Sequence, residues 1–257
     1  MSIRVGVIGA SGRMGSTVCE TVEGDAGLEL VAAVDALASP GSTAVGRLPI
    51  GTDLAALPES GAQVVDDFTT AAAARDNLAL VAGWGMHAVV GTTGFDEADL
   101  DRFRSAFTAS NCLIAPNFAI GAVLLMRFAE LAAPYFESAE VIEFHHDNKV
   151  DAPSGTAART VELMAQASAD WTPDPTLHEV VPGARGGVGA AGIHVHSVRM
   201  RGLVAHQEVL LGTTAQLLTM RHDSFDRTSF MPGVLLAIKA IADHPGVLVG
   251  LDTYLDL

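Results

Sequence analysis

The chain has 257 residues, of which 49% are hydrophobic and 18% are charged, a composition typical of a compact globular protein. Its formal net charge of −15 argues against a nucleic-acid partner, because binding to phosphates requires a basic surface. The longest apolar stretch, residues 118–136, contains Arg127 and Glu130, so it is not predicted to cross a membrane. With two cysteines and a strand pattern that begins at Ile3, the sequence suggests neither a disulfide framework nor a signal peptide, and we expect a cytoplasmic protein.

The first half of the chain alternates short apolar runs with amphipathic stretches. The runs typical of strands cover residues 3–8, 28–34, 64–68, 87–90 and 112–115. The stretches with helical periodicity include residues 14–22, 71–82 and 97–107. This alternation is typical of βαβ units, and it predicts a parallel sheet covered by helices.

The pattern changes after residue 118. We expect an apolar helix to about residue 133, a strand over 139–146, a helix over 155–168 and an irregular segment over 170–192, which is rich in proline and glycine. Three further strands are predicted over 193–200, 204–211 and 215–222. Their short connections favour an antiparallel sheet. A last helix over 232–242 and a strand over 247–249 return to the first pattern.

A glycine-rich turn joins the first strand to the first helix. It reads Gly9-Ala10-Ser11-Gly12-Arg13-Met14-Gly15, with the spacing G-x-x-G-x-x-G instead of the usual G-x-G-x-x-G of dinucleotide sites. Glycines at such a turn let backbone N–H groups and the helix N-terminus approach a pyrophosphate. A turn of this kind can also join a strand to a helix without binding anything, so the interpretation needs support from other segments.

Asp35 provides part of that support. It ends the second predicted strand, 20 residues after Gly15, where a carboxylate can accept hydrogen bonds from the adenosine ribose; an ordinary turn aspartate is the alternative. Polar or glycine-rich segments also follow the third, fourth and fifth strands, at the edge where open α/β sheets bind ligands. The residues predicted to line the cofactor site are Gly9, Ala10, Ser11, Gly12, Arg13, Met14, Asp35, Phe68, Gly91, Thr92, Thr93, Ala115, Pro116, Asn117 and Phe118.

The choice between NADH and NADPH depends on charge beside the ribose. Asp35 repels a 2′-phosphate and Ala36 offers no cation, which favours NADH. Arg13 is either a solvated arginine at the helix start or a group that reaches a 2′-phosphate. We therefore expect use of both NADH and NADPH, with NADH at least as good.

Together these patterns predict an α/β fold with two domains. Residues 1–118 and 230–257 are expected to form a Rossmann-like dinucleotide-binding domain. Residues 119–229 are expected to form an inserted α+β domain built on a mixed or antiparallel sheet. Domain boundaries of this kind are defined by the change of pattern after residue 118 and by its return near residue 230.

Residues 140–157 carry a longer motif. They match E-x-x-E-x-H-H-x-x-K-x-D-x-P-S-G-T-A at every fixed position, and in this form the segment resembles the signature of dihydrodipicolinate reductases. The glycine turn, the G-T-T-G loop and the A-P-N-F segment also match, so the resemblance covers nearly the whole chain. It implies an NAD(P)H-dependent oxidoreductase that reduces 4-hydroxy-tetrahydrodipicolinate, or dihydrodipicolinate, to tetrahydrodipicolinate in lysine and diaminopimelate biosynthesis. It also implies a small cyclic dicarboxylate as substrate, and a homotetramer assembled through the inserted domain.

The residues of this motif suit that chemistry. His145 and His146 are neighbours on a strand and point to opposite faces, so they cannot easily chelate one metal, and no metal site is predicted. Gly155 and Thr156 follow Ser154 at a helix start, where backbone N–H groups favour a carboxylate. His145 is our candidate for the general acid, because imidazole exchanges protons near neutral pH.

The resemblance adds roles for other residues. It implies that Lys149 acts in catalysis with His145 by helping to donate the proton and by holding a carboxylate, and that His146, Ser154, Gly155 and Thr156 bind substrate. The division of the proton-donor role between His145 and Lys149 stays open. The alternatives are another NAD(P)-dependent dehydrogenase of an amino-acid pathway and a non-enzymatic NAD(P)H-binding protein, but neither accounts for the motif.

Two further pairs of polar residues have simpler interpretations. His194 and His196 share one face of a predicted strand and form a possible half of a metal site. No acidic partner is expected near them, which favours a packed or interface pair. The tandem acids Asp66 and Asp67 are expected to be solvated or to cap a helix rather than to act in catalysis.

Overall fold

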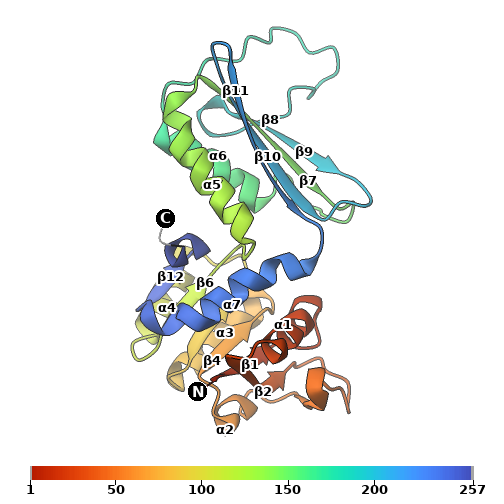
Figure 1. Cartoon of the computed structure of the whole chain (residues 1–257), viewed down its shortest axis with the longest axis vertical. Coiled ribbons are helices and arrows are strands. Elements are labelled where there is room, and N and C mark those ends of the chain that lie inside the picture. Colours follow the sequence, from red (N-terminus) through yellow and green to blue (C-terminus); the bar gives the residue numbers. More distant parts are fainter. Residues whose placement is uncertain (1, 256–257) are drawn as a thin grey trace. The chain divides into compact units, whose positions relative to one another are not determined.

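The computed structural model describes residues 2–255, and the chain divides into two compact units (Figure 1). The first unit combines Met1–Phe118 with Phe230–Leu257, and the second is the continuous segment Ala119–Ser229. Within residues 2–255 we find no helix with the length and apolar character that a membrane crossing requires.

The first unit is built on a sheet of seven parallel strands in the order β12-β6-β5-β4-β1-β2-β3. The strands are β1 (Ile3–Ile8), β2 (Leu28–Val34), β3 (Ile50–Gly51), β4 (Val64–Asp67), β5 (His87–Val90), β6 (Cys112–Ile114) and β12 (Val247–Val249). Its helices are α1 (Arg13–Gly24), α2 (Ala56–Ser60), α3 (Ala71–Gly83), α4 (Glu97–Ala106) and α7 (Met231–Ala240). The chain runs from β1 to β2 and β3 on one side, then returns to β4 on the other. The strand order therefore reverses at β1, the place where doubly wound sheets bind ligands.

The core of this unit explains why its strands are short apolar runs. Helices lie on both faces of the sheet, so side chains of both alternating sets are buried, as is typical of parallel sheets. On one face Ile8 and Val65 pack with Leu57 of α2 and Leu78 of α3. Because all the strands run in the same direction, their carboxyl ends lie together along one edge of the sheet.

The second unit is built on a mixed sheet in the order β11-β10-β7-β9-β8. Its strands are β7 (Ser138–His145), β8 (Gly187–Val188), β9 (His194–Arg199), β10 (Ala205–Thr213) and β11 (Gln216–Ser224), and its helices are α5 (Ile120–Ala132) and α6 (Gly155–Ala167). Both helices lie on the same face (Figure 1). Their buried side chains, such as Leu125 and Met164, pack with Val141, Val209 and Leu211 of the strands.

Short 3₁₀ helices complete both units. They are η1 (Val45–Arg47), η2 (Ala133–Tyr135), η3 (Ala190–Gly192), η4 (Arg227–Phe230), η5 (Ile241–Asp243) and η6 (Leu251–Tyr254). Like the two-residue strands β3 and β8 and the short helix α2, these turns are too brief to leave a periodic pattern in the sequence.

The predicted antiparallel arrangement of the last three strands is wrong for β9. β10 and β11 form the expected hairpin, but β9 lies parallel to β7, which separates it from β10. The connection over residues 200–204 looks like a hairpin loop in the sequence. Five residues can nevertheless cross the end of one strand, since two strand spacings amount to about 10 Å and an extended residue spans about 3.3 Å.

The expectation that both tandem acids are solvated or capping is also wrong. Asp66 and Asp67 lie in β4, inside the sheet, and are fully buried. Asp67 accepts hydrogen bonds from the backbone N–H and hydroxyl of Thr69, at 2.8 and 2.6 Å, and from Nδ2 of Asn77 at 2.8 Å. Neither carboxyl oxygen of Asp66 has a partner among the described residues. Burial, together with the neighbouring Asp67, raises the pKa of Asp66 well above its usual value.

Candidate active site

The glycine turn between β1 and α1 is tightly packed. Gly9 has a φ of +80°, and a Cβ on Gly15 would lie 2.1 Å from the carbonyl oxygen of Gly9, so only glycine fits there. Gly12 is the N-cap of α1 and provides no side-chain hydrogen bond to the helix. The first N–H groups of α1 therefore form a set of backbone donors suited to a pyrophosphate.

Asp35 lies directly at this turn. Its Oδ2 accepts a hydrogen bond from the Ser11 N–H at 3.0 Å, and its Oδ1 accepts one from the Leu37 N–H at 2.9 Å. A carboxylate has further lone pairs, which ribose hydroxyls could use. Ala10 and Ser11 also line a cavity of about 480 Å³, whose other walls are α1 and residues 42–45 and 50. Arg13 is exposed at the start of α1.

The ends of β4, β5 and β6 meet through contacts among their side chains. The rings of Phe68 and Phe118 lie 5.7 Å apart, and a Cβ on Gly91 would lie 2.0 Å from the Phe68 ring. The hydroxyl of Thr92 donates to the carbonyl oxygen of Thr69 at 2.9 Å. Of the other residues predicted here, Thr93 and Pro116 are exposed, Met14 and Asn117 are half-buried, and Ala115 is buried. The donors, the close approach at the turn and the acidic strand end fit a dinucleotide.

In the second unit, the predicted catalytic histidine contacts a buried glutamate. Glu143 and His145 lie two residues apart on one face of β7, and His145 Nδ1 is 2.5 Å from Glu143 Oε2. Arg199, at the end of β9, donates to both oxygens of Glu143, at 2.9 and 2.7 Å. Burial raises the pKa of Glu143, but hydrogen bonds from His145, Arg199 and Ser197 outweigh it and lower the pKa to about 2.

The same carboxylate anchors the start of α6. The Ser154 N–H donates to Glu143 Oε1 at 3.2 Å, and Ser154 Oγ accepts from the Ala157 N–H at 3.2 Å as the N-cap of the helix. Gly155 is exposed and Thr156 is half-buried in the first turn. The helix N-terminus, which favours an anion, is thus tied to the strand that carries His145.

Lys149 lies in the loop between β7 and α6. Its Nζ donates to both carboxylate oxygens of Asp151 at 2.8 Å, and Arg199 Nη2 donates to the carbonyl oxygen of Asp151 at 2.7 Å. His146 is exposed at the beginning of the same loop. One network of hydrogen bonds therefore links the segments that carry the predicted catalytic and substrate-binding residues.

No role for Glu143 or Arg199 is predicted from the sequence. Glu143 is a fixed position of the motif, and its spacing of two from His145 on a strand was the available signal. Arg199 gave no such signal, because its position opposite His145 depends on the parallel pairing of β7 with β9.

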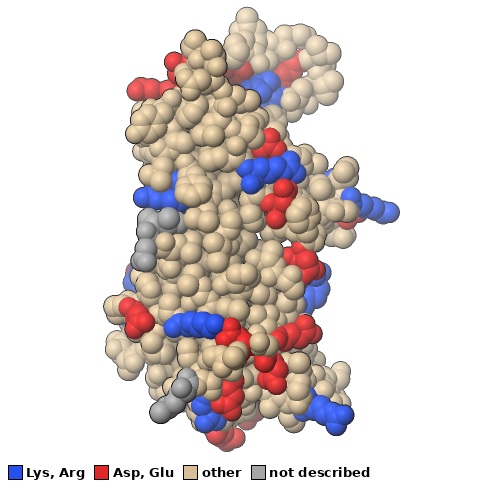
Figure 2. All heavy atoms as spheres, viewed as in Figure 1, with Lys and Arg blue, Asp and Glu red and all other residues tan. Residues whose placement is uncertain are grey.

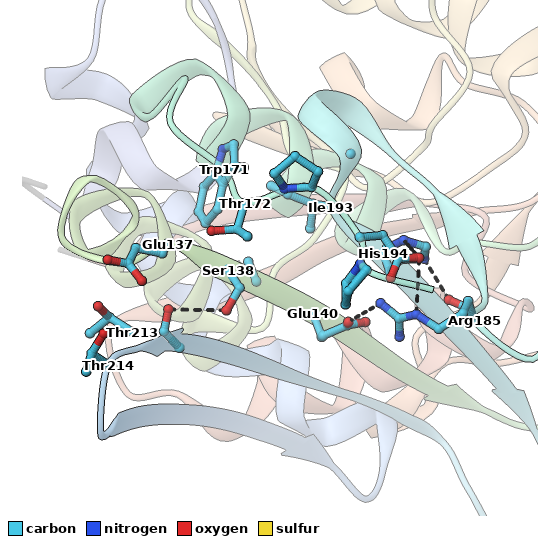
Figure 3. A pocket seen from close by; sticks show the side chains of 16 residues that line it. Glu137, Ser138, Glu140, Trp171, Thr172, Arg185, Ile193, His194, Thr213 and Thr214 are labelled. Atoms are coloured by element: carbon cyan, nitrogen blue, oxygen red, sulfur yellow. Dashed lines mark hydrogen bonds and ion pairs between the residues drawn. The ribbon is translucent and has the colours of Figure 1, made fainter. Parts of the chain in front are cut away.

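His194 and His196 lie on the other face of this sheet. His194 lines a cavity of about 480 Å³ there (Figure 3). The expectation of no acidic partner is wrong: His196 Nε2 is 2.7 Å from Glu140 Oε2, and His194 Nε2 is 3.2 Å from Asp174 Oδ2. Arg185 bridges both acids, at 2.7 Å from Glu140 and 3.4 Å from Asp174. Residues 2–255 contain no group of three or more His, Cys, Asp or Glu that could hold a metal ion, and no predicted site residue lines this cavity.

Comparison with known proteins matches both parts of the chain. The family model for the N-terminus of dihydrodipicolinate reductase matches residues 3–118, and the model for its C-terminus matches residues 121–255. Proteins named 4-hydroxy-tetrahydrodipicolinate reductase from Nocardia farcinica and Corynebacterium aurimucosum are 53% and 50% identical, each alignment covering 100% of both chains.

A solved structure is similar over the same length. The dipicolinate-bound dihydrodipicolinate reductase from Paenisporosarcina sp. TG-14 has a TM-score of 0.88 and 37% identity, and the alignment covers 98% of this chain and 99% of that one. The matches extend over both units and include the glycine turn and the motif around His145. The chain therefore belongs to the dihydrodipicolinate reductase family.

Proposed function

We propose that the chain reduces 4-hydroxy-tetrahydrodipicolinate, or the dihydrodipicolinate formed from it, to tetrahydrodipicolinate with NADH or NADPH, in lysine and diaminopimelate biosynthesis. The observation that carries the proposal is the Glu143-centred network, which collects a histidine, a lysine and a helix N-terminus in a chain that also has a dinucleotide turn. Membership of the reductase family and the bound dipicolinate of the Paenisporosarcina structure support the choice of a cyclic dicarboxylate.

The chain's residues would bind the acid groups and supply a proton. The first N–H groups of α6, at Gly155 and Thr156, would hold a carboxylate with Ser154 and His146, and each charge-assisted hydrogen bond would contribute about 1.5–3 kcal/mol. When bound, the reduced nicotinamide supplies the hydride. His145 would donate a proton to the ring, assisted by Lys149.

The cofactor would bind at the turn after β1. The N–H groups at the start of α1 would hold the pyrophosphate, Asp35 the adenosine ribose, and the ends of β4, β5 and β6 the rest of the dinucleotide. The carboxylate of Asp35 disfavours a 2′-phosphate, whereas the exposed Arg13 is free to approach one. We infer use of both cofactors, with NADH at least as good.

The proposal includes assembly into a homotetramer. The sheet face opposite α5 and α6 carries the half-buried apolar side chains Ile142, Phe144 and Leu210, which supports a homotetramer built through this sheet.

The proposal also includes a cytoplasmic location. Both cysteines, Cys19 and Cys112, are free and buried, which fits a cytoplasmic enzyme.

Mutual binding of NADH and pyridine-2,6-dicarboxylate tests the proposal. The dicarboxylate should tighten NADH binding at least fivefold, measured by nicotinamide fluorescence, because both ligands serve one reaction. The Lys149→Ala variant should keep NADH affinity, lose most of the dicarboxylate effect and lower turnover by about 10²-fold or more. NADH binding that the dicarboxylate leaves unchanged would instead indicate a nucleotide-binding protein or a dehydrogenase for another substrate.

A further inference from the structure

We propose that Glu143 is a positioning residue that holds His145 in the tautomer with hydrogen on Nδ1, so that Nε2 is the atom that transfers the proton. The inference rests on the proposed function only in assigning the proton transfer to His145. The tautomer itself follows from the geometry of β7 and β9.

Glu143 accepts hydrogen bonds and does not donate them. Burial raises the pKa of Glu143, but hydrogen bonds from Arg199 and Ser197 counter this effect, so the side chain is a carboxylate at neutral pH and cannot donate. The 2.5 Å contact between its Oε2 and His145 Nδ1 therefore requires a hydrogen on Nδ1. In the neutral ring Nε2 then has the lone pair, and in the charged ring it has the transferable proton.

The position of Glu143 is fixed by more than this one contact. Its side chain is fully buried, and it receives two hydrogen bonds from Arg199 on β9 and one from the Ser154 N–H at the start of α6. A carboxylate held at both oxygens cannot rotate away from the imidazole without taking the half-buried Arg199 guanidinium out of its ion pair, which is costly. His145 is held in turn, with 16% of its side chain exposed.

Among residues 2–255, the charged groups linked to this pair by ion pairs and hydrogen bonds lie on β9 and in the loop after β7. Arg199 faces it from β9, and the Lys149–Asp151 ion pair lies in the loop that follows β7. From β10, the residues paired with His145 and Glu143 are the uncharged Ala205 and Gln207. Glu143 is therefore the acceptor that determines which ring nitrogen of His145 carries hydrogen.

The chain contains a matched control on the same strand. Glu140 lies on the opposite face of β7 and also contacts a histidine and an arginine, His196 at 2.7 Å and Arg185 at 2.7 Å. Among residues 2–255, its carboxylate oxygens pair with His196 and Arg185, and neither is proposed to act on substrate. Glu140→Gln therefore removes a carboxylate from an equivalent His–Glu–Arg group without touching His145.

The direct test is nitrogen NMR of protein labelled with ¹⁵N-histidine, in which ring shifts and couplings distinguish the two tautomers. The His145 resonances are assigned from their loss in His145→Asn. In the wild-type protein, neutral His145 should carry its hydrogen on Nδ1; in Glu143→Gln that preference should be lost, and in Glu140→Gln it should persist. Hydrogen on Nε2 in the wild-type protein would overturn the proposal, and this result does not depend on whether Glu143→Gln folds.

The kinetic test asks whether the tautomer matters for turnover. Glu143→Gln should lower kcat about 10²-fold and leave the KM for the dicarboxylate and the Kd for NADH within about threefold of wild type, because only proton transfer depends on the tautomer. Glu140→Gln should stay within about threefold of wild type in kcat as well. Loss of rate together with an equal loss of affinity for both ligands would assign Glu143 a merely structural role.

The two measurements separate this inference from the proposed function. Hydrogen on Nδ1 in a protein that reduces no dicarboxylate would refute the function and leave the tautomer established. Full reductase activity in Glu143→Gln would refute the positioning role and leave the function intact.

Discussion

Two buried carboxyl groups show how local donors decide the charge of a residue. Glu143 has hydrogen bonds from His145, Arg199 and Ser154, and its pKa lies at about 2 although burial opposes this. Asp66 is equally buried, has no partner among residues 2–255, and has a pKa well above the usual value. Burial favours the neutral acid in both cases, and only the donors around Glu143 reverse the effect.

Asp35 is the residue whose substitution should report on cofactor choice. Asp35→Ala removes the acceptor proposed for the adenosine ribose and also the negative charge that disfavours a 2′-phosphate. We expect the Kd for NADH to rise about tenfold or more, and the Kd for NADPH to rise less or to fall. Fluorescence titration with each cofactor measures both, and equal effects on the two would show that Asp35 does not contact the ribose.

Among the strands, β4 carries the buried acid Asp66, whose carboxyl oxygens have no hydrogen-bond partner among residues 2–255. The pKa of Asp66 is about 3.9 in an unfolded chain and is raised in the folded one. Between these two pKa values, Asp66 is protonated in the folded protein and ionised in the unfolded chain. The stability that protonated Asp66 contributes is therefore fully present below about pH 4, and it is lost as the pH rises towards the folded pKa. Asp66→Val should raise the free energy of unfolding by about 1–3 kcal/mol at pH 8, and by less at pH 5.

Urea denaturation followed by circular dichroism at both pH values checks this expectation. Asp67→Val is the matched control from the other face of β4. It should destabilise the protein at both pH values, because Thr69 and Asn77 would lose their acceptor. A gain from Asp66→Val that is the same at pH 5 and pH 8 would contradict the assigned cause.

The strands and helices of this chain could be predicted from the periodicity of their apolar residues. Most predicted strands and helices begin and end within about two residues of the observed ones, because apolar periodicity marks the buried faces directly. The predicted antiparallel pairing of β9 was wrong, because the sequence of a five-residue connection does not reveal whether the chain turns back beside β9 or crosses the end of another strand. Arg199 was missed for the same reason: which side chain lies opposite His145 depends on pairing between strands that are distant in sequence.

The net negative charge of the whole molecule differs in sign from the charged groups that we propose bind substrate. Charged side chains of both signs are scattered among uncharged ones on the visible face (Figure 2), and the net charge is −15. The proposed substrate site nevertheless brings together His145, Lys149 and the N-terminus of α6, with Arg199 neutralised by Glu143. A dianionic substrate would thus be recognised by a few hydrogen-bond donors at the site rather than by the electrostatic potential of the whole protein.

A steady-state assay shows whether this chain reduces a cyclic dicarboxylate with a reduced nicotinamide. The substrate is generated enzymatically, and the loss of NADH or NADPH absorbance is followed. We expect consumption of NADH that depends on substrate formation, at rates on the order of 1–10³ s⁻¹. Slower or equal turnover with NADPH is expected. A folded protein that binds NADH and leaves it unoxidised while substrate accumulates would mean that the chain is not this reductase.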